Sequence, residues 1–138
     1  MPFTGNFTCN SFKTELLNGD VDFSGDTFKI ALYTNQASLD ASTTAYTSSG
    51  EVSASGYTAG GETLTPTVGA SSGTSFVNFN NVSWSAAFTA RGALIYKFNG
   101  TTNPAVCVLD FGADRTSTTT FTVQFPATSS TTALIRLA

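Results

Sequence analysis

The chain has 138 residues, of which 11% are charged, and its formal net charge is −3 at pH 7. This length suits one domain, residues 1–138, with a buried core, and the charged share is under half of the about 25% usual in soluble proteins. Six scattered Lys and Arg residues exclude a basic surface for duplex nucleic acid, and the absence of His excludes a Ser-His-Asp triad and most zinc sites.

Residues 1–8 are predicted to form an extended N-terminal arm. The aromatic side chains of this arm, Phe3 and Phe7, could dock on a neighbouring protein. No apolar run in the chain approaches the roughly 18 residues of a membrane span, and the arm has no basic segment followed by a hydrophobic one. We therefore expect no cleavable signal and no membrane insertion.

The next segment predicts a short helix, the one helix that we expect. Asn10 or Ser11 can cap its first turn, because Asn and Ser side chains accept hydrogen bonds from free backbone N–H groups. Gly19 follows Leu17 at a place where helices commonly end.

The residues after this helix imitate the start of a calcium-binding loop. Asp20 and Asp22 stand at alternate positions, and Gly25 is the sixth residue. The twelfth position is Ala31, whereas a calcium loop needs a bidentate Glu there. The pattern therefore favours a solvated turn over a metal site, and the sequence predicts no metal and no cofactor.

The first clear strand is residues 27–34, in which Phe28, Ile30 and Leu32 share one face and Lys29, Ala31 and Tyr33 the other. This alternation predicts an inner and an outer face.

The long segment 35–65 follows, with few large apolar side chains and no helical pattern. Such a loop has to be held by neighbouring structure or by another molecule, so we expect it to be an interaction surface. Tyr33, Tyr46 and Tyr57 are its candidate contact residues, and they could instead form an aromatic platform for carbohydrate.

Regular strands occupy the rest of the chain. Alternating or continuous apolar residues, separated by Gly, Asn, Pro and Ser turns, predict strands at 63–68, 75–79, 82–84, 93–98, 105–111, 119–125 and 133–137. Trp84 and most Phe residues are expected in the core. With residues 27–34 this makes about eight strands. The expected fold is therefore all-β, an antiparallel two-sheet β-sandwich of jelly-roll type, with a closed barrel as the alternative.

The two cysteines, Cys9 and Cys107, lie far apart in the sequence. Cys107 stands in the apolar run PAVCVLDF, which is typical of a small core residue. Since the chain carries no secretion signal, we expect two free thiols and no disulfide.

Catalytic patterns are weak. GASSG matches the string around a serine nucleophile, but Ser71 has no imidazole base. Asp110 and Asp114 flank a turn, and Glu51 and Glu62 stand in a polar loop with nothing to raise a carboxyl pKa. We therefore expect no enzyme activity.

Several blocks resemble a family of small virion proteins of tailed bacteriophages, in the same order along nearly the whole chain. These blocks are FKIALYT, LDASTTAYTSSGEVSASGYTAGGETL, VSWSAAFTARGALIYKF, NPAVCVLDFGADRTSTTTFTVQFPA and LIRLA. Within that group the chain is most similar to head cement, or decoration, proteins. GYTAGG and VLDFGADRTS are the more specific phrases, and both are structural.

The resemblance implies a non-enzymatic β-sandwich protein, made in the bacterial host cytoplasm and present in many copies on the outer capsid surface. There it would clamp neighbouring major capsid protein subunits and stabilise the head. We expect the protein to pair with itself, as a homodimer or, in the alternative, a trimer. A tail or baseplate accessory protein and a carbohydrate-binding module are the other functions that the composition allows.

Overall fold

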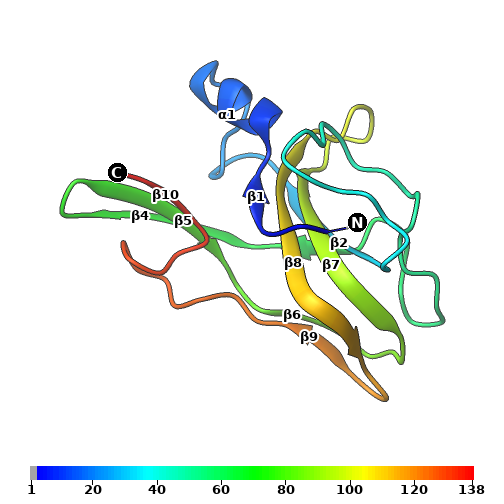
Figure 1. The fold of residues 1–138 in the computed structure, drawn as a ribbon. Helices are drawn as coiled ribbons and strands as arrows, with labels where there is room; N and C mark the ends of the chain where they lie inside the picture. Colours follow the sequence, from blue (N-terminus) through cyan, green and yellow to red (C-terminus); the bar gives the residue numbers. More distant parts are fainter. Residues whose placement is uncertain (1–2) are drawn as a thin grey trace.

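The computed structural model describes residues 3–138. Within this range the chain forms ten β-strands and one helix, so a mostly β protein with one short N-terminal helix is confirmed. The elements are β1 (Phe7–Thr8), α1 (Asn10–Leu17), β2 (Phe28–Tyr33), β3 (Glu62–Leu64), β4 (Pro66–Ser71), β5 (Thr74–Phe79), β6 (Val82–Trp84), β7 (Thr89–Lys97), β8 (Ala105–Thr116), β9 (Phe121–Val123) and β10 (Ile135–Leu137). Figure 1 shows them along the chain.

Helix α1 ends where the sequence indicates, but the predicted cap by Asn10 or Ser11 was wrong, because the N-cap residue is Cys9 and its side chain makes no capping hydrogen bond. Gly19 has a positive φ of 81° and follows the last helical turn. The Gly19 N–H donates to the Leu16 carbonyl at 3.2 Å and the Asp20 N–H to the Glu15 carbonyl at 2.8 Å, which is the Schellman arrangement. The helix spans eight residues, and no helix of the described chain is long and apolar enough to cross a membrane.

The main body is a five-stranded antiparallel sheet in the order β1-β8-β7-β2-β3. Its middle strand β7 pairs with β2 from Phe28↔Lys97 to Tyr33↔Gly92. The predicted outer face of β2 is covered, since Ala31 and Tyr33 are fully buried. That expectation was wrong because the loop of residues 34–61 packs over this face.

The strand predicted at 63–68 is two strands in two different sheets. β3 pairs with β2, whereas β4 begins at Pro66 and pairs with β5 along its whole length. The chain therefore leaves the main sheet at Thr65. Pro66 has no N–H to donate, which suits the start of an edge strand.

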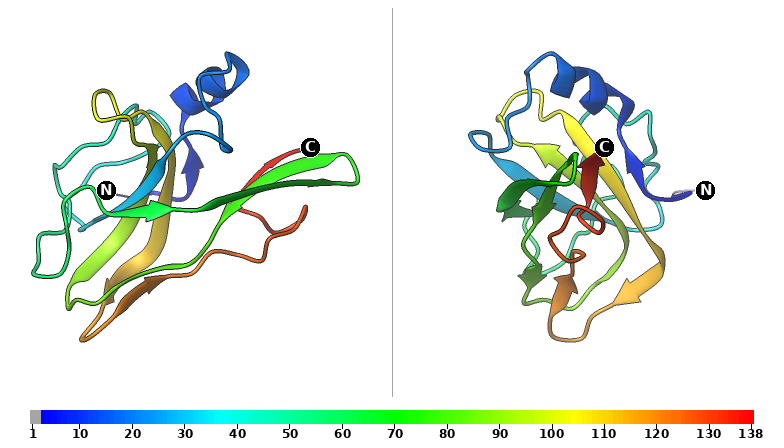
Figure 2. Two further views of the ribbon diagram at one scale, coloured as in Figure 1. Left: turned by 180° about the vertical axis from the view of Figure 1, so that it is seen from behind. Right: turned by 90° about the vertical axis from the view of Figure 1, so that its left-hand side faces the viewer.

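Strands β4, β5 and β10 form a second sheet in the order β10-β5-β4, and β6 with β9 forms a third. The second sheet projects from the five-stranded body as an arm (Figures 1 and 2). We call β4, β5 and β10 the three-stranded arm. The strands thus divide into three open sheets, where the sequence predicted two.

Two groups of aromatic rings pack between these sheets. The first lies between α1, β2 and the three-stranded arm and consists of Phe12, Phe23, Phe28, Phe79 and Phe125. The second lies between β6, β9 and the main sheet and consists of Tyr57, Trp84, Phe88, Phe111 and Phe121. The predicted core position of Trp84 is confirmed, because its side chain is 2% exposed.

Candidate protein-interaction surfaces

The long loop is held to the body by a carboxylate at its centre. Glu51 accepts hydrogen bonds from the Tyr46 hydroxyl at 2.6 Å, from the Tyr57 hydroxyl at 2.7 Å and from the Gly60 N–H at 2.8 Å. The Tyr96 hydroxyl donates to the Gly60 carbonyl at 2.7 Å. We call these residues the Glu51 network.

All four tyrosines of the chain lie in or beside this network, since the Tyr33 hydroxyl donates to the Thr47 carbonyl at 2.7 Å in the same loop. Burial raises the pKa of Tyr96 to about 12, with the Glu51 charge as the second cause. Burial also raises the pKa values of Tyr33 and Tyr57. The hydroxyls therefore stay protonated and can donate to the carboxylate and carbonyls that face them.

The tyrosines predicted as contact residues are mostly turned inward. Tyr33 is fully buried and Tyr57 is 8% exposed, so both have their surfaces covered by their own chain. Tyr46 is half-buried and stacks on Tyr96 with ring centroids 4.9 Å apart. The three rings form no exposed platform. Of the two supports expected for this loop, neighbouring structure or another molecule, neighbouring structure is present, because β2 and β7 form hydrogen bonds with it through Leu32 and Tyr96.

The N-terminal arm also lies on the body. Phe3 is 1% exposed and packs against Gly92, where any larger residue would overlap its ring. Phe7 is half-buried in β1, which pairs with β8 at Val108. The described residues of the N-terminal arm therefore pack on the body of their own chain and do not extend freely toward a neighbouring protein, as was predicted. Residues 1–2 of the predicted arm lie outside the described residues.

The polar patterns in the sequence form a local turn at Asp22, whereas Asp110 and Asp114 lie within β8 and do not flank a turn as predicted. Asp22 Oδ1 accepts from the Ser24 N–H at 2.9 Å and from the Ser24 hydroxyl at 2.6 Å, and these bonds lower the Asp22 pKa. Asp110 forms an ion pair with Arg91 at 3.1 Å. Among residues 3–138 no cluster of three His, Cys, Asp or Glu residues could hold a metal ion.

Cys9 and Cys107 are free and buried, as predicted. Burial raises the pKa of Cys9 to about 11, and burial raises that of Cys107 further above its ordinary value. Thiols in this state are poor nucleophiles at neutral pH, because the thiolate is the reactive form. They act as small core residues.

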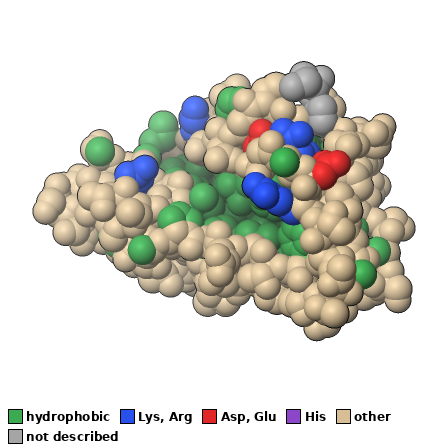
Figure 3. Space-filling view, turned by 60° about the horizontal axis from the view of Figure 1, so that its bottom comes forward, with side chains coloured by type: hydrophobic (Ala, Val, Ile, Leu, Met, Phe, Trp, Pro, Cys, Tyr) green, Lys and Arg blue, Asp and Glu red, His purple; other side chains and the backbone are tan. Residues whose placement is uncertain are grey.

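A groove of about 700 Å³ lies between α1, β1 and β10, and we call it the inter-sheet groove. Its lining residues are Thr8, Phe12, Lys13, Leu16, Leu17, Thr74, Ser130, Leu134, Ile135, Arg136, Leu137 and Ala138. Figure 3, which brings the underside of Figure 1 forward, shows hydrophobic side chains gathered in a hollow on that side of the molecule, with Lys and Arg side chains beside it.

An apolar face of the three-stranded arm lies beside the inter-sheet groove and shares Ile135 and Leu137 with it. Val68, Val77 and Ile135 stand opposite one another on the three strands and therefore share one face. Helix α1 and Phe23 cover only part of that face. At its margin Val68 is 60% exposed and Leu137 is 58% exposed, which is unusual for large apolar side chains on one contiguous surface.

Two free strand edges meet the inter-sheet groove. β1 is an edge strand of the main sheet, and β10 is an edge strand of the three-stranded arm. Residues of both strands line the groove. A free edge offers backbone N–H and C=O groups for pairing with another chain.

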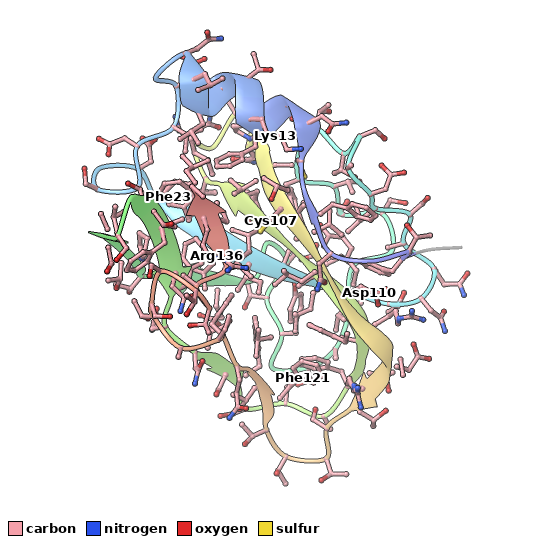
Figure 4. All side chains as sticks on the ribbon, turned by 60° about the vertical axis from the view of Figure 1, so that its left-hand side comes forward. Lys13, Phe23, Cys107, Asp110, Phe121 and Arg136 are labelled. Carbon is pink, nitrogen blue, oxygen red and sulfur yellow. The ribbon has the colours of Figure 1, made fainter. Side chains whose placement is uncertain are left out.

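The charged groups of the groove are cations. Lys13 and Arg136 line it, and Figure 4 labels both, Lys13 on α1 and Arg136 on β10. The ion pairs of residues 3–138 are Arg91 with Asp110 and Lys97 with Asp26, so neither groove cation is paired with a carboxylate. Arg136 donates instead to the Thr131 carbonyl at 2.5 Å.

The groove residues were not among the predicted contact residues. One signal was present in the sequence, because Leu16 and Leu17 are adjacent near the end of a short helix and cannot both face the core. Leu17 is 87% exposed. No feature of the sequence indicated that Leu137 is exposed. The alternation in 133–137 predicts which side chains share a face, but it does not predict whether another segment covers that face.

No protein-family model, curated protein or solved structure matches the chain.

Proposed function

We propose that the chain is a non-enzymatic structural protein of a tailed-phage virion, a cement protein that binds the outer capsid surface and clamps neighbouring major capsid protein subunits. The observation that carries the proposal is the three-stranded arm, which projects from a well-packed body and leaves part of its apolar face uncovered. A projecting apolar face is suited to a protein interface. The resemblance to cement proteins described above supports the same function.

The surface chemistry supports a binding role. With 11% charged residues and many Ser and Thr residues, the surface can meet another protein without removing many ions from water. Asp22 lies in a turn, Asp110 in an ion pair and Glu51 in the Glu51 network, and the thiols are buried. Such an arrangement suits adhesion better than catalysis.

We further propose that the three sheets are an open form of a two-layer β-sandwich, with the main sheet as one layer and β5, β6, β9 and β10 contributing the other. The aromatic groups between these strands support two layers. The proposed assembly is a homodimer on the capsid, with a trimer as the alternative, because a closed symmetric patch avoids open-ended growth.

The test is the position and copy number of the protein in the purified phage that encodes it. Electron microscopy of the particle is expected to show the chain on the outside of the head, and gel densitometry is expected to give many copies per particle. A few to a few dozen copies would assign it to the tail. Absence from the particle would refute the virion role.

A further inference from the structure

We propose that the inter-sheet groove binds an extended polypeptide segment, which adds as a strand to the free edge of β10 and carries carboxylates toward Lys13 and Arg136. The segment belongs to a protein other than a second copy of this chain. The inference rests on the proposed function, because it takes the occupant to be part of a partner protein in an assembly.

The backbone of β10 supports strand addition. β10 pairs with β5 along one edge, from Ile135↔Val77 to Leu137↔Ser75, and no strand of residues 3–138 pairs with its other edge. That free edge borders the groove. An added strand would satisfy its N–H and C=O groups, while alternate side chains of the added strand would enter the apolar lining.

The lining favours a segment with apolar side chains at alternate positions. Leu16 of α1 lines the groove together with Leu134 and Leu137 of the C-terminal segment, and Leu137 is more than half exposed. Burying such side chains stabilises a complex by about 25 cal/mol per Å² of apolar surface. A nucleic acid would gain little here, because its backbone needs many cations and offers no apolar side chains.

The charges decide between a foreign segment and a second copy. The whole chain carries −3, yet the groove presents Lys13 and Arg136, which have no carboxylate partner within residues 3–138. Two copies joined by a two-fold axis through this groove would bring these cations against their own counterparts, which repel. A segment with Asp or Glu residues flanking its apolar positions meets both requirements.

The experiment begins with a random library of twelve-residue peptides displayed on phage and selected against the purified full chain. Counter-selection uses the double variant Lys13→Glu with Arg136→Glu. We expect an enriched group of peptides in which apolar residues alternate and Asp or Glu residues flank them. Basic peptides, or no peptide that discriminates between the two proteins, would overturn the proposal.

The best enriched peptide is then measured by fluorescence anisotropy. The Lys13→Glu and Arg136→Glu double variant is expected to weaken binding at least about tenfold, as two lost charge contacts of about 1 kcal/mol each require. The matched control is the double variant Lys29→Glu with Arg115→Glu, which has the same net charge as the groove variant but changes two residues outside the groove. It is expected to bind the peptide within about twofold of the unchanged protein. Equal loss in both variants would show only a long-range charge effect and would overturn the site.

Strand addition has its own readout. N-methylation of every second backbone amide of the peptide removes the N–H groups on one side of the strand. One of the two alternating sets is expected to abolish binding and the other to leave it within a few fold. If neither set matters, the peptide does not add as a strand, and the proposal fails.

Two further outcomes separate this inference from the proposed function. If the double variant binds purified heads as well as the unchanged protein does, the groove is not the contact, whereas the cement function stands. If the peptide results hold and the protein binds no head, the groove inference stands and the cement function fails.

If the unchanged protein is a dimer that the double variant dissociates in analytical ultracentrifugation, the groove is a contact between copies, and the inference is wrong.

Discussion

The long loop over β2 and the three-stranded arm are both rich in Ser, Thr and Gly, yet the loop packs closely on the body while one face of the arm stays exposed. The loop covers the main sheet and buries Tyr33 and Tyr57 through the Glu51 network. The arm leaves Val68 and Leu137 more than half exposed. The difference shows that a few long-range hydrogen bonds, rather than composition, decide which polar segment closes over the body and which face stays open.

The largest expected effect is on the closed region, at Gly61. Its φ is 80°, and a methyl group added there would overlap the Ile30 carbonyl of β2. We expect Gly61→Ala to lower the free energy of unfolding by about 4 kcal/mol, because the backbone has to move. Urea denaturation measures this.

The matched control lies at the tip of the three-stranded arm. Gly73 has nearly the same φ of 81°, with nothing within 4 Å of an added Cβ. Gly73→Ala is expected to cost about 1 kcal/mol, from the left-handed backbone alone. Equal losses at the two positions would show that the loop is not packed against β2 as described.

The second effect tests the Glu51 network. Glu51→Ala leaves two tyrosine hydroxyls and the Gly60 N–H without their acceptor, so we expect a loss of about 3 kcal/mol in the free energy of unfolding. Glu62→Ala is the control, since Glu62 is exposed on β3, and it is expected to change stability by less than about 0.5 kcal/mol. A loss under about 1 kcal/mol at Glu51 would mean that other contacts hold the loop.

The third effect is a fall in stability at alkaline pH. The Tyr96 pKa is raised to about 12 in the folded chain, against an ordinary value of 10.0, so the unfolded chain loses this proton first. The contribution is fully present below pH 10 and is lost as pH rises toward 12, at about 1.4 kcal/mol per pH unit at most.

Thermal unfolding followed by circular dichroism between pH 9 and roughly pH 11.5 measures this loss. The Tyr96→Phe variant removes the titrating group and is expected to show a smaller fall. An identical pH profile in that variant would exclude Tyr96 as a cause.

The smallest expected effect on stability is on the open region. Leu137→Ser removes a side chain that is 58% exposed, so we expect the free energy of unfolding to change by less than about 1 kcal/mol. Leu94→Ala, at a fully buried position of β7, is expected to cost about 2–5 kcal/mol. Urea denaturation compares the two, and a large loss at Leu137 would show that the arm face is part of the core.

Local signals in the sequence predicted much of the fold. The end of the helix is indicated by Gly19, and the start of β6 by Asn80 and Asn81, which precede Val82. Periodicity could not separate β3 from β4, since the two strands follow each other with one residue between them and differ only in their partners. The burial of the tyrosines was not predicted for a related reason. Alternation along a strand indicates that the strand has two faces, but it does not indicate which other segments cover each face.

The phrase GYTAGG illustrates the same limit. Its Tyr57, Gly60 and Gly61 are ordinary turn residues when considered alone, yet all three lie where the loop meets Glu51 and β2. No signal within six residues could indicate those partners, which stand earlier in the sequence.

By itself the sequence determined the helix, the strand content and the shortage of catalytic groups, because each depends on neighbouring residues or on composition. Only the tertiary structure decided that the tyrosine loop closes over the main sheet while the arm of β4, β5 and β10 keeps an apolar face and a free edge open. The physical reason is that coverage is set by contacts between residues far apart in the chain, such as Leu32 with Tyr57, Gly60 with Tyr96, and Ile135 with Val77.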